Sequence, residues 1–504
     1  MGSAVKTAVG LAGVFFAPTL GSLAFGYGVS AGLSVTTAGL LASGAVIGAT
    51  LVSASIAGSA LTPQASDVGG AEAYAGQKLQ TQKTNTAPVP ILYGYNRSAG
   101  NIVFQETNDY NNANSSSKGY NRSYWGVYVM AGHDINDLIS IKADDITLTE
   151  SGSGIWYDSG RDKIFIKGQY ISSDTNVTAL SFPYSSTLTA TGSTIGLSSA
   201  VIPAGTYVLL VHQIFDAENN VNTKFANITA NTQGKKIKTF TDSSTISSTT
   251  SYSYNPANIV YDLLVNALAV TDSEIDIESF YNSQQNCSTN GWYCHLALIQ
   301  QNNIQSIISD VLATCRGQLH HCEGQWRLKI DTKSQTSVKT IDNDDIINNS
   351  FTISMKGNQD IANKLIFKFV NVNDDYQSDQ KVVESSTLQS LDGQTIEKIL
   401  DVKGVTDVGQ ASELCEITLN TMRYSEDASG NRVNQTPLIC SFGTTVKHAD
   451  LEIGDVITID HDLLDRNRKF MILSMETDQS GFLLITAREY AETHYKDDSG
   501  TYLI

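Results

Sequence analysis

The chain has 504 residues, which is too long for one ordinary domain and predicts two to four domains with their own cores. Only 17% of the residues are charged, against about 25% on average, so turn-rich β structure is favoured over helix bundles and coiled coils. A formal charge of −18 disfavours a reader of DNA or RNA sequence, because such proteins need clustered Lys and Arg. It remains compatible with a channel along which DNA slides without adsorbing.

The beginning of the chain lacks charge. Residues 7–66 contain no charged residue, and 31 of these 60 positions are Gly, Ala or Ser. Of the apolar stretches at about 8–25 and 38–61, the second is long enough to span a bilayer, which takes about 20 residues. We expect an apolar helical segment within residues 1–75. A buried or lumen-plugging helical hairpin, membrane insertion, and a targeting or disordered segment remain open alternatives.

Period-two patterns begin after a polar connector at 62–86. Short apolar runs between turn residues predict strands at 87–94, 100–105, 124–130 and 206–215, and two short strands within 134–148 around 143–145. Between them, the stretch 171–200 holds 14 Ser or Thr in 30 residues, a composition that favours surface hairpins and indicates an insertion.

Helical signals follow. Asn255 before Pro256 is typical of a helix N-terminus. A second helix is predicted from Asn302 to Gly317, with apolar residues at helical spacing. Glu323-Gly324 then predicts a tight hairpin turn. These elements together predict an α/β unit.

The rest of the chain returns to a strand pattern from Phe351. One helix is predicted at about 408–423, with Leu414, Ile417, Leu419 and Met422 as its apolar residues. Strands separated by Gly and Asp turns are predicted at 436–442, 456–459, 470–473 and 483–487. We interpret this end of the chain as a small closed barrel.

A search for catalytic or metal-binding patterns gives only weak candidates. There is no His-Glu-x-x-His pair or phosphate-binding glycine loop. The six cysteines are too few for a disulfide scaffold, so free thiols are expected. Their pairs are spaced too widely for a typical zinc knuckle, although three histidines lie nearby. These residues are Cys287, Cys294, Cys315, Cys322, Cys415, Cys440, His295, His320 and His321.

Acidic pairs, histidines and tryptophans receive structural interpretations. Neighbouring carboxylates on a strand point to opposite faces, which disfavours a glycosidase pair at Asp144/Asp145, Asp344/Asp345 or Asp374/Asp375. The scattered histidines are interpreted as packing or surface residues: His133, His212, His448, His461 and His494. The tryptophans are assigned to cores and interfaces: Trp125, Trp292 and Trp326. We therefore predict no catalytic, cofactor-binding or metal-binding residue.

Six short blocks carry a resemblance to a known family. They are Pro88 to Gly94 with Gly100 to Phe104; Thr206 to Phe215 with Gly234 to Ile237; Tyr254 to Leu264; Cys315-Arg316-Gly317 with Trp326 to Leu328; Asn363 to Tyr376; and Leu451 to Ile457 with Thr486 to Tyr490. In this order, the blocks resemble the central tail hub proteins of long-tailed bacteriophages, the family of tip attachment (host specificity) proteins and gene-transfer-agent hubs.

The resemblance implies a trimer whose subunits each give two tube-like β-barrels, so that three chains present a pseudo-sixfold ring to the tail tube. We therefore expect a mainly β fold with an α/β part. The first barrel is expected at 76–250, with its Ser/Thr-rich insertion at about 151–200. An α/β unit at 251–335 and a second barrel at 336–504 complete the expected organisation.

The resemblance also implies a structural role at the tail tip or baseplate of a virion assembled in the host cytoplasm. The expected partners are two further copies, tail tube or distal tail proteins, the tape-measure protein, and tail fibre or receptor-binding proteins. Genomic DNA would pass through a gated lumen without specific binding. Because the sequence ends at Ile504, soon after the last block, we expect separate proteins to recognise the host.

Two other functions stay open. The uncharged residues 7–66 are compatible with a membrane-penetrating tail-tip effector that contacts the host membrane. A glycan-degrading tail enzyme is less favoured, because only chance acidic pairs suggest it. The leading expectation is a protein without enzymatic activity or a cofactor.

Overall fold

The computed structural model describes residues 88–110, 121–144, 146–158, 163–183, 201–215, 225–300, 302–357, 360–477 and 481–495. The expected apolar segment at 1–75 lies outside these residues, as does most of the Ser/Thr-rich stretch. Within the described ranges, no helix is both long enough and apolar enough to cross a membrane.

The first part of the fold is a pair of packed antiparallel sheets. The larger sheet has the order β3 (Asn101–Tyr110), β4 (Asn121–Ala131), β12 (Thr206–Phe215), β9 (Lys163–Ile171), β8 (Ile155–Asp158) and β7 (Thr149–Glu150). The second contains β16 (Ser251–Tyr252), β13 (Ile228–Ile237), β5 (Ile135–Ala143) and β6 (Ile146–Thr147), and β2 (Tyr95–Ala99) also pairs with β13. Tyr128 and Leu209 from the first sheet pack with Ile141 from the second in one buried core.

The outer face of the larger sheet has its own apolar cover. Trp125 and Leu210 pack there against Phe182 and Ile202. These covering residues belong to the segment with η1 (Val177–Ala179) and the short pair β10 (Thr175–Asn176) and β11 (Val201–Ile202).

A unit of three helices and short strands follows in the described chain. It contains α6 (Pro256–Ala267), η3 (Asp272–Glu274), α7 (Ile277–Asn290), α8 (Ile304–Ala313) and the hairpin β18 (Gly317–Cys322) and β19 (Gln325–Ile330). Short strands border it: β14 (Phe240–Asp242) pairs with β15 (Thr245–Ile246), and β1 (Ile91–Tyr93) pairs with β17 (Leu296–Leu298). The predicted cap is confirmed, since Asn255 accepts a hydrogen bond from the Ala257 amide.

The last part has a six-stranded and a three-stranded sheet. The larger runs β20 (Lys339–Ile341), β28 (Val456–Ile459), β29 (Arg468–Thr477), β30 (Leu483–Glu489), β27 (Leu438–Thr444) and β21 (Thr352–Met355). The smaller runs β23 (Gln377–Glu384), β22 (Lys364–Asn371) and β24 (Glu397–Asp401). The other elements here are η4 (Asn343–Asp345), η5 (Val372–Asp374), α9 (Ser386–Asp392), α10 (Val408–Arg423), β25 (Ser425–Glu426), β26 (Arg432–Val433), η6 (Val446–His448) and η7 (Glu492–His494).

The predicted helix at 408–423 is confirmed as α10. It packs with Leu414 and Ile417 against Leu365 and Phe367 of β22. This cluster is continuous with the core of the α/β unit and crosses the expected boundary at 335/336. The domain boundaries therefore remain predictions.

The expected closed barrels are not found among the described residues, where both large sheets are open. The first sheet ends at β3 and β7, and the C-terminal sheet ends at β20 and β21. In the C-terminal sheet, the segment between the two edge strands fills the inner face, with Ile346 and Phe351 packing on Phe442 and Ile457. An apolar face covered in this way does not need closure.

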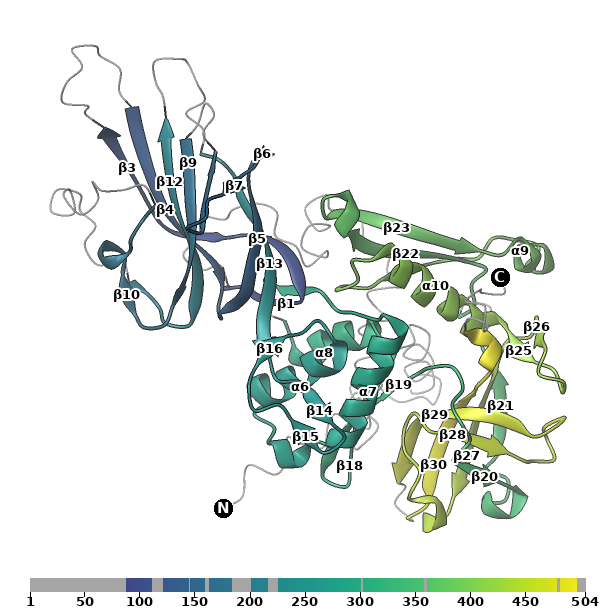
Figure 1. The fold of residues 1–504 in the computed structure, drawn as a ribbon. Coiled ribbons are helices and arrows are strands. Elements are labelled where there is room, and N and C mark those ends of the chain that lie inside the picture. Colours follow the sequence, from purple (N-terminus) through teal and green to yellow (C-terminus); the bar gives the residue numbers. More distant parts are fainter. Residues whose placement is uncertain are drawn as a thin grey trace, which may run out of the picture.

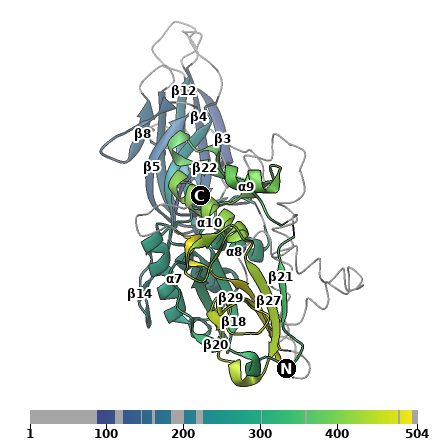
Figure 2. The same ribbon diagram turned by 90° about the vertical axis from the view of Figure 1, so that its right-hand side faces the viewer.

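Figures 1 and 2 show how these parts lie in space. The first pair of sheets projects at one end of the molecule. The α/β unit and the C-terminal sheets lie side by side at the other end, in agreement with their shared core.

Candidate functional site

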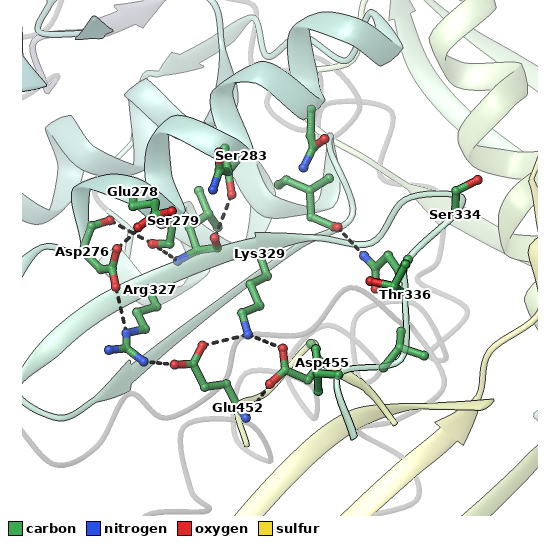
Figure 3. Close-up of a pocket in the computed structure, with 18 residues that line it drawn as sticks. Asp276, Glu278, Ser279, Ser283, Arg327, Lys329, Ser334, Thr336, Glu452 and Asp455 are labelled. Carbon is green, nitrogen blue, oxygen red and sulfur yellow. Dashed lines mark hydrogen bonds and ion pairs between the residues drawn. The ribbon is translucent and has the colours of Figure 1, made fainter. Parts of the chain in front are cut away.

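A network of ion pairs joins the α/β unit to the C-terminal sheet (Figure 3). Arg327 and Lys329 alternate along β19 and so lie on one face. The Lys329 Nζ lies 2.7 Å from Glu452 Oε2 and 2.6 Å from Asp455 Oδ1, in the loop before β28. Arg327 also pairs with Glu452, and its Nε lies 3.0 Å from Asp276 Oδ2. Ion pairs among Arg327, Lys329, Glu452 and Asp455 thus hold the two structural units together, and the cap of α7 positions Arg327 within its own unit.

Residues at the start of α7 satisfy the backbone groups on the outer side of β19, where no further strand pairs with it among the described residues. Asp276 caps α7 by accepting from the Ser279 amide, and its own amide donates to the Trp326 carbonyl. The Leu328 amide donates to Ser279 Oγ at 3.2 Å, and Ser283 Oγ donates to the Leu328 carbonyl at 2.7 Å. Side chains of α7 therefore satisfy backbone groups that an edge strand would expose.

A polar cavity of about 490 Å³ lies between α7, residues 334–338 and residues 452–456 (Figure 3). Its lining includes the carboxylates and cations of the network, together with hydroxyl and amide groups. The uncharged polar residues are Ser279, Asn282, Ser283, Asn286, Ser334, Gln335 and Thr336. Gly454 packs closely against Gln318, because a Cβ at position 454 would lie 2.8 Å from Gln318 Oε1.

The charged groups that line this cavity form ion pairs between the α/β unit and the C-terminal sheet; we call this contact the first joint. The carboxylates of Glu452 and Asp455 are both engaged in ion pairs with the cations of β19. Burial, followed by the charges of Lys329 and Arg327, lowers the pKa of the adjacent His320 to about 3. That imidazole is therefore neutral near pH 7 and does not supply a general acid.

A second joint connects the first sheets to the C-terminal part. Asp375, in the β22–β23 connection, lies 2.7 Å from Arg97 Nη1 of β2 and 2.5 Å from Lys142 Nζ of β5. Hydrogen bonds from Arg97 and from Lys142 outweigh partial burial and lower the pKa of Asp375. The ring of the next residue, Tyr376, lies 6.1 Å from that of Tyr95.

A buried charge cluster reinforces the first joint. The Asp331 carboxylate pairs with Arg316 and lies 3.2 Å from Arg488 Nη2, and it also accepts from Tyr495 Oη. Burial raises the pKa of Asp331, but the two guanidinium groups outweigh this effect and lower it overall. Because Arg488 belongs to β30, the cluster fixes that sheet to the open end of the β18–β19 hairpin, where Arg316 precedes β18 and Asp331 follows β19.

The structure places the cysteine and histidine candidates apart from any metal site. Five cysteines are buried and Cys322 is half-buried; none forms a disulfide among the residues described. Within the described ranges, no group of three or more His, Cys, Asp or Glu side chains could hold a metal ion. His295 accepts from the Tyr95 amide at 3.0 Å, and His321 packs edge-on against Trp326.

The remaining candidates also have structural positions. His133 accepts from the Leu92 amide, His212 stacks on Trp125, His461 stacks on Phe351, His448 lies 3.0 Å from Asp345, and His494 contacts the Tyr424 carbonyl. Trp292 is buried in the core of the α/β unit. Asp344 lies in η4, Asp374 lies in η5, and Asp145 lies outside the described residues.

The residues that form the two joints were not identified as a site from the sequence. Arg97, Arg327, Lys329 and Glu452 contact partners far along the chain, and no local spacing signals such pairs. Only Asp375 was singled out, as half of an acidic pair.

Comparison with known proteins gives one family match. Residues 303–475 match the family model described as "Putative phage tail protein", which is less than half of the chain. A search of curated proteins finds no match. The matched region includes β19, the loop of Glu452 and Asp455, and the connection that holds Asp375.

Solved structures add a likeness of fold. A chain from the virion of a native gene transfer agent (GTA) particle has a TM-score of 0.51 and 13% identity, over 83% of this chain and 88% of that chain. The prophage tail protein gp18 from Listeria monocytogenes EGD-e has a TM-score of 0.27 and 10% identity, over 77% of this chain and 88% of that chain. The second score is too low to establish a shared fold. Together with the family match, the first likeness supports a structural protein of a phage tail.

Proposed function

We propose that this chain is the trimeric hub of a bacteriophage-type tail. Three copies would surround the tail axis at the tip or baseplate, joining the tail tube or distal tail proteins to fibre or receptor-binding proteins. The observation that carries the proposal is the match of residues 303–475 to a phage tail family. The likeness in fold to a chain of a gene transfer agent virion agrees with the proposal.

The two joints support this role physically. A hub must hold ring-forming parts at a fixed separation while the tail transmits force. Asp375 ties the first sheets to the C-terminal part, and Glu452 ties that part to the α/β unit. Paired charges at both joints, one of them backed by the buried Asp331 cluster, favour a rigid subunit.

The charge of the chain agrees with a DNA passage. At −18 overall, three copies would repel a polyanion and keep it from adhering to the lumen. We propose that the tape-measure protein occupies the lumen before DNA passes. The passage of DNA would then be gated within the lumen of the hub. The protein would act by shape and assembly, without an active site.

The stoichiometry of the chain in purified particles tests the proposal. Quantitative mass spectrometry against labelled peptides of this chain and of the tail tube protein should give three copies per tail. Native mass spectrometry of the isolated full chain should give a species three times the monomer mass of 54.3 kDa. One copy per tail, or absence from particles, would reject the hub.

A second candidate rests on the uncharged residues 7–66. In this case, the chain would also contact the host membrane as a penetrating effector. Dye release from vesicles of bacterial lipid, caused by the full chain and lost on deletion of residues 7–66, would support it. The same deletion tests the alternative in which residues 7–66 plug the lumen. Unchanged DNA retention and ejection by particles with this deletion would count against that lumen-plugging role.

A further inference from the structure

Strand β21 forms one edge of the C-terminal six-stranded sheet. Figures 1 and 2 both place it at the margin of that sheet. In the described part of the chain, its only strand partner is β27, with Thr352 opposite Ser441 and Ser354 opposite Ile439. The other side of β21 is therefore the place where this sheet can be extended.

The direction of the backbone groups follows from two side-chain contacts. Thr352 Oγ1 donates to the Ser441 carbonyl at 3.2 Å, and Ser354 Oγ donates to the Ile439 carbonyl at 3.4 Å. Both carbonyls thus point toward β21, which places Thr352 and Ser354 at the positions that bond to β27. Because backbone groups alternate along an antiparallel strand, the N–H and C=O groups of Ile353 and Met355 point away from β27.

This edge lacks the charges that normally discourage strand addition. Residues 352–355 are Thr, Ile, Ser and Met. The other edges of the two C-terminal sheets carry charged residues: Lys339 on β20; Asp379, Lys381 and Glu384 on β23; and Glu397, Lys398 and Asp401 on β24. Charges on edge strands oppose pairing with another chain, so β21 is the edge left open to it.

The two faces of β21 specify what would pair with it. On one face, a row of hydroxyl side chains crosses four strands and ends at the edge: Thr352, Ser441, Thr486 and Ser474 are successive neighbours. Ser441 Oγ lies 3.0 Å from Thr486 Oγ1. On the other face, Ile353 packs against the sheet core, and Met355 is 60% exposed.

We propose that β21 accepts an extended strand from another protein, adding a seventh strand to this sheet. The incoming segment would be uncharged and would alternate Ser or Thr with apolar residues. Its hydroxyl groups would continue the row that ends at Thr352, and its apolar side chains would cover Met355.

The incoming strand is not the β21 strand of a second copy of this chain. Two β21 strands could pair only about a twofold axis, since the same strand would lie on both sides of the contact. A closed threefold ring has no such axis, so this choice of partner depends on the proposed hub. The binding chemistry of the edge does not depend on it.

The direct test uses the full chain and a synthetic probe peptide, Lys-Lys-Thr-Val-Thr-Ile-Thr-Val-Thr. Binding is measured by fluorescence anisotropy, and hydrogen exchange reports the amides of Ile353 and Met355. We expect saturable binding, slower exchange at both amides, and about tenfold weaker binding by Met355→Lys and Met355→Pro. Leu463→Lys is the matched control, because Leu463 is 65% exposed in the loop between β28 and β29, and this variant should bind as the native chain does.

Other results would overturn the proposal. A peptide of the same composition with its four threonines in one block should bind at least tenfold more weakly, and equal binding would contradict pairing in register. No binding, or protection elsewhere than at β21, would refute the open edge. Dimers through β21 in solution would overturn the choice of partner. Binding by a chain that proves monomeric in particles would retain the edge while rejecting the hub, so the two failures are distinguishable.

Discussion

The Asp375 carboxylate lies 2.7 Å from the Arg97 guanidinium, although 278 residues separate the two along the chain. This contact connects the turn of one C-terminal sheet to the sheets of the first unit. Asp375 has a φ of 51°, a left-handed conformation that Asp and Asn adopt more readily than most residues. Asn can therefore replace it without new backbone strain.

Asp375→Asn should loosen this joint at neutral pH. We expect a loss of about 1 kcal/mol in the free energy of unfolding, because the carboxylate is largely exposed and screened. Urea unfolding measures the loss, and limited proteolysis should show faster cleavage between the units. Asp374→Asn is the matched control and should leave both unchanged. Equal effects of the two variants would contradict the joint.

The same pair predicts a pH dependence. The folded-state pKa of Asp375 is lowered, so its contribution is present above the unfolded pKa and is lost as pH falls through the folded pKa. The stability difference between the native chain and Asp375→Asn should therefore shrink on acidification below about pH 4. A difference that grew toward acid would have the wrong sign.

At the other joint, Glu452→Gln should cost about 2 kcal/mol, because the carboxylate is mostly buried and serves both Arg327 and Lys329. Glu323→Gln provides a control on the same arginine. Glu323 is 73% exposed, and its replacement should cost less than about 0.5 kcal/mol. Thermal unfolding of both variants at low and high salt tests the difference, which should persist in salt.

Alanine substitutions at two glycines distinguish the stability cost of backbone strain from that of a steric clash. Gly454 and Gly481 have φ values of 87° and 83°, so alanine is strained at both. A Cβ at position 454 would also lie 2.8 Å from Gln318 Oε1, whereas a Cβ at 481 would meet no atom of the described residues within 4 Å. Gly454→Ala should therefore lose about 1 kcal/mol more stability than Gly481→Ala. Equal losses in denaturant unfolding would refute tight packing at this joint.

The thiols offer a test of the core. Cys322 is half-buried and the other five cysteines are buried, and burial raises the pKa of Cys294, Cys315, Cys415 and Cys440. A thiol reagent at pH 8 should modify Cys322 quickly and the others only on unfolding. Mass spectrometry of the labelled peptides identifies the sites. Fast labelling of Cys315 in the native chain would contradict the described core.

Local sequence signals predicted several elements well. Asn255-Pro256 marked the start of α6, and apolar spacing located α10 at 408–423. Helix α7 was missed because it is polar on most sides and buries only Phe280, Ser283 and Cys287. Its cap at Asp276 and the left-handed Gly291 at its end were the available signals.

Other features depend on tertiary contacts that sequence spacing does not reveal. The open C-terminal sheet results from the segment with Ile346 and Phe351 covering its inner face. The joints at Asp375 and Glu452 depend on residues brought together only by the complete fold. The site was therefore less predictable than the helices.

Cryo-electron microscopy of intact tails tests the central proposal most directly. The account predicts density for three copies of this chain around the tail axis at the tip, each with the Arg97–Asp375 contact formed. A single copy off the axis, or tails that are complete without this chain, would contradict it.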